Sequence, residues 1–222
     1  MSIVSNISPL APKNFPIMHS ISGVRFATAN AGIKSGDSED ATLILLEPET
    51  VIAGLFTSSM TRSAPVIDCQ NKIGINFENT GAAIIVNSGN ANAFTGRHGE
   101  LAVREIIAEL STRVQIPVER IFSSSTGVIG ELLEYQKIIN VFDYLVDSLH
   151  VSKIENAARA IMTTDTFPKG SSVKVRSSGG KITISGIAKG SGMIAPNMGT
   201  MLVYICLLYT SDAADEVCFG VG

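Results

Sequence analysis

Short apolar runs that alternate with stretches of helical periodicity constrain the fold of this chain more than any other feature. Ala82 to Val86 form an apolar run of strand length, and Asn87 to Gly96 follow as a loop of small polar residues. From Gly99 to Val114 the apolar residues recur at helical spacing, and Pro117 lies just beyond. Because strand-like apolar runs and helical patterns alternate along the chain, the sequence predicts an α/β fold with mixed sheets covered by helices.

Other segments extend this alternation on both sides. Apolar, β-branched stretches predict strands within 23–33, 41–58 and 120–130 and over Met201 to Ile205. A second helix is predicted over Leu132 to Leu149. A third begins at Ser152, where Ser152 and Glu155 match a capping box. Val173 and Val175 alternate ahead of Gly179-Gly180, which predicts a hairpin with its turn at the glycines.

Composition excludes several classes of protein. Of 222 residues 45% are hydrophobic and 17% charged, so the chain can bury a sizeable core. A net charge of −3 disfavours nucleic acid as a partner. No apolar run reaches the roughly 18 residues of a membrane span, and the first residues lack the pattern of a secretory signal. Three scattered cysteines indicate neither a metal site nor a disulfide framework, so we expect a soluble cytoplasmic protein.

Three loops of small residues lie at the predicted ends of strands or helices. They are Ser123 to Gly127, Thr163 to Thr166, and Lys189 to Gly192. Composition alone leaves open that each is an ordinary turn. Lys189 beside glycines suggests phosphate binding, but the lysine precedes the glycines and the P-loop pattern is absent. The histidines are scattered and predict no serine or cysteine triad.

Four motifs occur in an order and spacing that is highly specific. They read "IVNSGNANAFTG", "SSSTGVIG", "IMTTDTFPK" and "KGSGMIAPNMGTML". Together they resemble the bifunctional ornithine acetyltransferase / N-acetylglutamate synthase family of arginine biosynthesis, over about Ser22 to Ile205. The resemblance implies a self-processing enzyme of the N-terminal nucleophile type, an α/β protein with sheets between helical layers.

The resemblance also implies roles for particular residues. Cleavage would occur between Gly199 and Thr200, where this chain has glycine in place of the family's usual alanine. Thr200 would then be the nucleophile and bind substrate, with its own α-amine as the base. Thr126 and Gly127 would stabilise the oxyanion through a hydroxyl and a backbone N–H. Lys189 would bind substrate, as would a threonine of the pair Thr163 and Thr164, with Thr163 favoured.

The implied reaction is a ping-pong acetyl transfer. N2-acetylornithine acetylates the nucleophile, ornithine leaves, and glutamate takes up the acetyl group. No metal or resident cofactor is implied, although acetyl-CoA is a possible donor, and the intact family protein is a heterotetramer of α and β chains. A related self-cleaving aminopeptidase or amidase, and a non-catalytic binding domain, are the alternatives.

The end of the chain has a different character. Residues 1–199 match the family's α chain and residues 200–205 match the start of its β chain. From Cys206 the sequence "CLLYTSDAADE" resembles a translated sequencing adapter, so we expect residues 206–222 to be non-native. Without a full β chain we expect an exposed apolar face, poor solubility and no catalytic activity.

Overall fold

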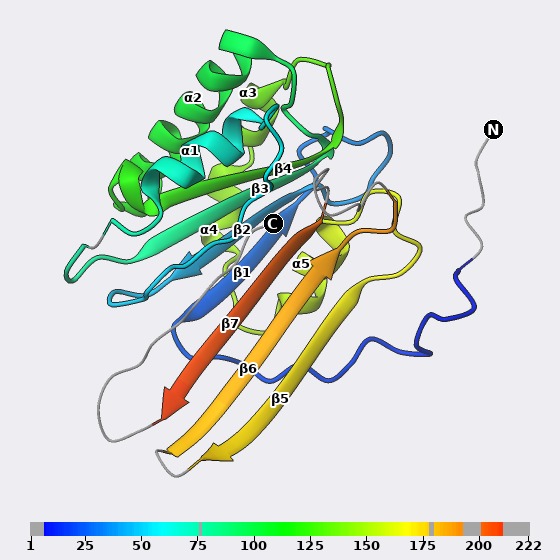
Figure 1. Ribbon diagram of the computed structural model, residues 1–222, viewed down its shortest axis with the longest axis vertical. Coiled ribbons are helices and arrows are strands. Elements are labelled where there is room, and N and C mark those ends of the chain that lie inside the picture. Colours follow the sequence, from blue (N-terminus) through cyan, green and yellow to red (C-terminus); the bar gives the residue numbers. More distant parts are fainter. Residues whose placement is uncertain (1–6, 76, 178–179, 193–200, 211–222) are drawn as a thin grey trace.

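The computed structural model describes residues 7–75, 77–177, 180–192 and 201–210. Two β-sheets and a set of helices make up this part of the chain (Figure 1). Sheet A has the strand order β1-β2-β3-β4 and consists of β1 (Val24–Ala29), β2 (Ala41–Leu46), β3 (Ala82–Asn90) and β4 (Ile121–Val128). Its first three strands are antiparallel, whereas β3 and β4 run parallel. The expected mixed sheet is therefore confirmed.

Helices cover one face of sheet A. They are α2 (Gly96–Val114), the 3-10 helix η1 (Val118–Arg120), α3 (Tyr135–Ile139) and α4 (Phe142–Asp147). One apolar core lies between this face and helices α2 to α4. It includes Leu43 and Ile85 of the sheet, Leu110 of α2 and Phe142 of α4, all buried. The connection from β3 to the parallel strand β4 runs through α2, as parallel pairing requires. Helix α1 (Ala64–Lys72) packs along the edge strand β4, and its buried Cys69 belongs to the core on the other face of sheet A.

Sheet B packs on the other face of sheet A. It is an antiparallel sheet of order β5-β6-β7, built from β5 (Lys169–Ser177), β6 (Gly180–Lys189) and β7 (Leu202–Thr210). A second core joins the two sheets and α5 (Ile154–Ala160), with Ile84 and Phe122 from sheet A, Ala157 from α5 and Tyr204 from sheet B. The layers are therefore helices, sheet A and sheet B, with α5 beside the second core (Figure 1).

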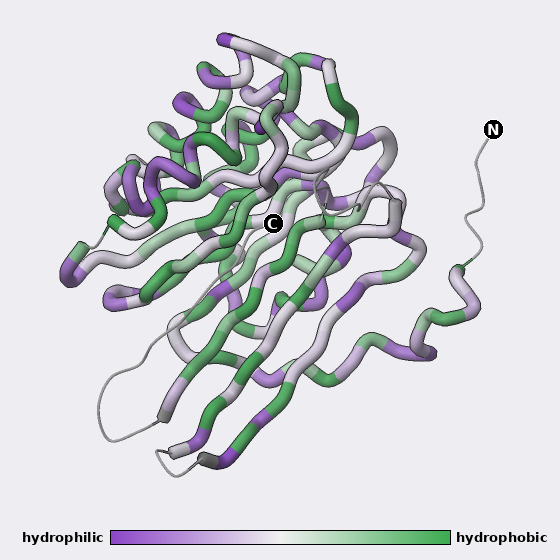
Figure 2. Tube along the Cα trace, viewed as in Figure 1, coloured by the Kyte–Doolittle hydropathy of each residue, from purple (hydrophilic) through white to green (hydrophobic). Residues whose placement is uncertain are grey.

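Sheet B buries only its inner face. Along β6 the buried residues alternate with partly exposed ones, as a half-buried strand requires. The outer face carries an apolar set consisting of Val173, Val175, Ile182, Ile184, Val203, Ile205, Leu207 and Tyr209. Figure 2 shows such apolar residues recurring along all three strands. Among the described residues no helix covers this outer face, so the expected exposed apolar face is present.

Several predicted boundaries were wrong. Residues 87–90 were expected to be loop but belong to β3, and Ser123 to Gly127 belong to β4. Several of their polar side chains make hydrogen bonds inside the fold, whereas the buried Ser123 hydroxyl has no hydrogen-bond partner among the described residues. The Ser125 hydroxyl donates to Asn87 Oδ1 at 2.6 Å, and the Ser88 hydroxyl donates to the Ala160 carbonyl at 2.5 Å.

The helices also differ from expectation. The predicted helix over 132–149 is two short helices, interrupted at Asn140 and Val141, and α1 was not predicted at all. The capping box at Ser152 does not form: α5 starts after Lys153 without a side-chain cap, and the Ser152 hydroxyl instead bonds His150 Nδ1 at 2.7 Å. The predicted strand at Met201 to Ile205 begins at Leu202 and continues without a break through Thr210.

Candidate active site

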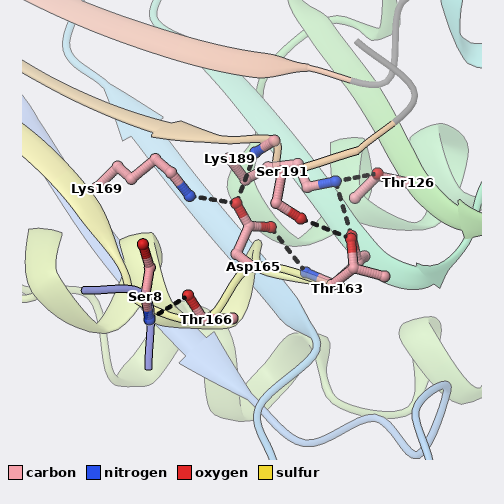
Figure 3. Close-up of polar contacts among 10 residues, drawn as sticks. Ser8, Thr126, Thr163, Asp165, Thr166, Lys169, Lys189 and Ser191 are labelled. Carbon is pink, nitrogen blue, oxygen red and sulfur yellow. Dashed lines mark hydrogen bonds and ion pairs between the residues drawn. The ribbon is translucent and has the colours of Figure 1, made fainter. Parts of the chain in front are cut away.

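One lysine joins three separate elements at the centre of the candidate site. Lys189 is the last residue of β6, Thr126 lies near the end of β4, and Thr163 lies in the loop after α5. The Lys189 ammonium donates to Thr126 Oγ1 at 3.1 Å and to Thr163 Oγ1 at 2.8 Å (Figure 3). Lys189 is 3% exposed and Thr126 4%. The structure thus brings together three residues that the motifs placed far apart in the sequence.

Asp165 holds the surrounding loops in place. Its carboxylate accepts hydrogen bonds from the backbone N–H of Gly190 at 2.7 Å and of Thr163 at 3.3 Å. The Lys169 ammonium lies 2.5 Å from the same carboxylate, whose side chain is fully buried (Figure 3). Asp165 therefore fixes the chain directly beside Lys189 and Thr163. Sequence reasoning assigned it no role, although it stands between Thr164 and Thr166 in the "TTDT" loop.

Burial perturbs both ionisable groups at the centre. Burial alone would raise the pKa of Asp165, but hydrogen bonds from Lys169, Gly190 and Thr163 outweigh it and hold that pKa below its ordinary value. Burial lowers the pKa of Lys189, an effect that the Asp165 carboxylate opposes and the Lys169 ammonium reinforces. Asp165 thus stays ionised in the folded site, and Lys189 loses its proton more readily than an exposed lysine.

Gly127 lies where the backbones of β4 and β3 are in close contact. Its φ is +141°, and a Cβ added there would come within 2.2 Å of the Gly89 carbonyl carbon and 2.5 Å of the Asn90 nitrogen. No other residue type fits such a position without moving the backbone. Thr126 and Gly127 therefore form a narrow wall held by β3.

A cavity of about 640 Å³ borders this wall. Its lining includes Thr126, Gly127, Thr163, Thr164, Lys189 and Lys34. Thr163 and Thr164 both reach it, but they have different partners: Thr163 accepts from Lys189, whereas Thr164 shares a 2.9 Å hydrogen bond with the Ser191 hydroxyl. Lys34 was not predicted from the sequence, because nothing near it in the chain marks a site.

The predicted cleavage site lies outside the described residues, because the structure does not describe Gly199 and Thr200. The strand that follows them is described. Leu202, two residues after Thr200, pairs with Lys189 in the register of β6 and β7. It also lines a smaller cavity of about 150 Å³ on whose wall Thr126 and Gly127 lie. The described start of β7 is therefore adjacent to the site.

Within residues 7–75, 77–177, 180–192 and 201–210, no three histidine, cysteine or acidic side chains gather as they would around a metal ion. No helix in that same part of the chain has the length and apolar character needed to cross a bilayer.

Several solved structures resemble this fold. The crystal structure of arginine biosynthesis bifunctional protein ArgJ from Bacillus halodurans matches with a TM-score of 0.72 and 32% identity, over 80% of this chain and 92% of that one. The ornithine acetyltransferase of Mycobacterium tuberculosis, solved with ornithine, matches with a TM-score of 0.67 and 29% identity, over 80% and 93%. The architecture is therefore the N-terminal nucleophile-type α/β fold of the ornithine acetyltransferases.

Sequence relatives give the same assignment. A model of the ArgJ family matches residues 25–214. The arginine biosynthesis bifunctional protein ArgJ of Ruegeria pomeroyi is 51% identical over 92% of this chain and half of that protein, and the ArgJ of Bartonella quintana is 43% identical over 94% and 49%. The chain belongs to the ArgJ family. It spans about half the length of the curated relatives it matches.

Proposed function

We propose that this chain carries part of the active site of a glutamate N-acetyltransferase, which moves an acetyl group from N2-acetylornithine to glutamate. The observation that carries the proposal is the Lys189 ammonium bound to the Thr126 and Thr163 hydroxyls, beside the start of β7. The names of its relatives and the ornithine bound in one structural neighbour support the choice of substrates.

The contact between Lys189 and Thr126 supports an oxyanion role for Thr126. Because the ammonium is only a donor, Thr126 Oγ1 must accept, and its own O–H is left to donate to another acceptor. A tetrahedral oxyanion on the acetyl carbon is such an acceptor, and the backbone N–H of Gly127 would be its second donor. One donor of this kind contributes about a hundredfold or more in rate.

The nucleophile in this mechanism is Thr200. Its hydroxyl first attacks the carbonyl of Gly199; the peptide C–N bond breaks, and hydrolysis of the resulting ester frees Thr200 as a new N-terminus. The Thr200 oxygen then attacks the acetyl carbonyl of N2-acetylornithine while the α-amine takes the hydroxyl proton. The amide bond breaks, ornithine leaves with a proton, and the amine of glutamate displaces the acetyl group from Thr200.

Substrate contacts, assembly and location complete the proposal. Lys189, Thr163 and Thr200 would contact the substrate, acetyl-CoA is an alternative acetyl donor, and the working enzyme would be a cytoplasmic heterotetramer of α and β chains. The 222-residue chain alone would be inactive. Its cavity wall is formed, but the relatives' sequences contain about as much chain again.

The test of this proposal measures both cleavage of the chain and transfer of the acetyl group. We would co-express the chain with the part of the Ruegeria pomeroyi relative that it does not cover, and measure chain masses and transfer of labelled acetyl to glutamate. In the co-expressed pair we expect cleavage between Gly199 and Thr200 and transfer of acetyl to glutamate. A Thr200→Ala variant should show neither cleavage nor transfer, and the chain alone should show no transfer. An uncut chain in the paired protein, or transfer that survives Thr200→Ala, would overturn the proposal.

A further inference from the structure

A second lysine reaches the large cavity from a different element. Lys34 lies in the loop between β1 and β2, is partly exposed, and lines the cavity together with Thr126, Gly127 and Lys189. Its ammonium donates to the Ala160 carbonyl at 3.0 Å and to the Glu39 carbonyl at 3.2 Å. An ammonium has three protons, so two acceptors among the described residues leave one for a ligand in the cavity.

The fold positions this ammonium by several independent contacts. The buried Asp40 carboxylate accepts backbone N–H groups from Ala31 at 2.7 Å, Ile33 at 2.6 Å and Lys34 at 2.9 Å. These bonds give the loop one conformation and satisfy the Asp40 charge. At Gly89, φ is +109° and an added Cβ would lie 3.0 Å from Lys34 Cγ. The absence of a side chain at Gly89 thus makes room for the lysine stem.

The two cavity lysines are suited to different tasks. Lys189 is almost fully buried and is bound to the two hydroxyls of the reacting centre. Lys34 is more accessible, and its hydrogen-bond partners within the described part of the chain are neutral carbonyls. Burial lowers the pKa of Lys34, while Asp40 raises it, Lys189 lowers it, and Asp165 raises it. Of these two cations, Lys34 is therefore the better placed to pair with a carboxylate from solution.

We infer that Lys34 binds the α-carboxylate of the amino-acid substrate, an assignment which rests on the proposed function. The donor N2-acetylornithine and the acceptor glutamate differ in their side chains, but both have an α-carboxylate. One fixed cation can therefore align both molecules in turn on the same acetyl group. Lys189 is then left to act with Thr126 at the reacting carbonyl.

The experiment compares two ligands on the purified chain. N2-acetylornithine and its α-carboxamide differ only in the charge and hydrogen bonding of the group that Lys34 is inferred to bind. We expect the wild-type chain to bind the acid about tenfold to a hundredfold more tightly than the amide, as measured by ligand-observed NMR titration. In Lys34→Met this preference should disappear through weaker binding of the acid, with amide binding unchanged. Lys34→Arg should retain most of it.

Lys137→Met provides the matched control. Lys137 also ties the β1–β2 loop, since its ammonium donates to the Gly32 carbonyl at 3.2 Å, but it does not line the cavity. The Lys137→Met variant should therefore still bind N2-acetylornithine more tightly than its α-carboxamide. Equal losses for acid and amide in Lys34→Met would show that Lys34 only tethers the loop and would overturn the inference alone. If the wild-type chain binds neither ligand, the inference about Lys34 is overturned and the proposed function is weakened. The proposed function is still tested separately, by the acetyl-transfer experiment.

Discussion

At the scale of single residues, the charge on Asp165 connects the stability of the fold to the geometry of the site. Its buried carboxylate accepts two backbone N–H groups and pairs with Lys169, and these contacts hold its pKa below the ordinary value. An ionised form that is favoured in the folded state stabilises that state at any pH where the unfolded group would also be ionised.

Asp165→Asn should therefore destabilise the chain by about 1–3 kcal/mol at pH 7. The difference from wild type should persist down to about pH 4, the ordinary pKa of the group, and shrink as the pH falls further through the depressed folded pKa. Thermal unfolding of the wild type and the variant between pH 7 and pH 3 measures this difference in stability. Asp143→Asn removes an exposed partner of Arg113 and should cost under about 0.5 kcal/mol. A difference for Asp165→Asn that does not depend on pH would contradict this account.

Sequence reasoning reached the residues that lie inside distinctive motifs and missed those defined only by contacts. Thr126, Thr163 and Lys189 came from motif resemblance, and the structure places them together. Asp165 and Lys34 were not assigned, because their roles depend on partners in other elements. Lys34, for example, bonds Ala160, which is 126 residues away in the chain. No local pattern encodes such a contact.

At the scale of elements, the wall of the site depends on how closely β4 can approach β3. The two strands pair in parallel up to Gly89 and Gly127, where the register becomes irregular at Asn90. Gly127→Ala should destabilise the chain by about 2–5 kcal/mol, because the new methyl group would overlap the backbone of β3 and the φ of +141° disfavours a side chain.

The free energies of unfolding of Gly127→Ala and Gly130→Ala in urea distinguish two effects. One is overlap of the new methyl group with neighbouring atoms, and the other is backbone strain at a positive φ. Gly130 also has a positive φ, +86°, but an added Cβ there meets nothing within 4 Å. Gly130→Ala should therefore cost only about 1–2 kcal/mol. Equal costs at the two glycines would mean that the close approach of β3 and β4 does not limit the site.

The helices and strands themselves were predictable where the apolar residues follow a single spacing, that of a helix or that of a strand. Strand β3, helix α2 and the β5–β6 hairpin followed from apolar periodicity and glycines. The ends of β3 and β4 did not, because buried polar side chains, such as Ser125 bonded to Asn87 across the two strands, have the composition of a loop. The capping box at Ser152 failed because the neighbouring imidazole of His150 binds its hydroxyl instead.

At the scale of the whole molecule, the outer face of sheet B carries a set of partly exposed apolar residues along its three strands. Val173 is 48% exposed and Val175 44%. The double change Val173→Thr and Val175→Thr keeps β-branched residues on the strand but lowers the apolar area, so self-association should fall while the unfolding temperature changes little. Sedimentation velocity at several protein concentrations measures this.

A substitution elsewhere on the surface controls for general solubility. Met60 is 97% exposed but lies in an irregular segment that is not part of sheet B. Met60→Thr should leave self-association unchanged. If it reduces association as much as the double change on β5 does, the outer face of sheet B is not the surface that drives it.

The two contacts of the Lys189 ammonium also have a consequence for the order in which the chain folds. Its two hydroxyl partners lie 63 and 26 residues away in the chain, in β4 and in the loop after α5. Local helices such as α2 form early, because short loops close at low entropic cost. The bridge from Lys189 to Thr126 forms only once the two sheets have docked. Recovery of ligand binding during refolding would therefore time the last step of assembly, after the helical signal is complete.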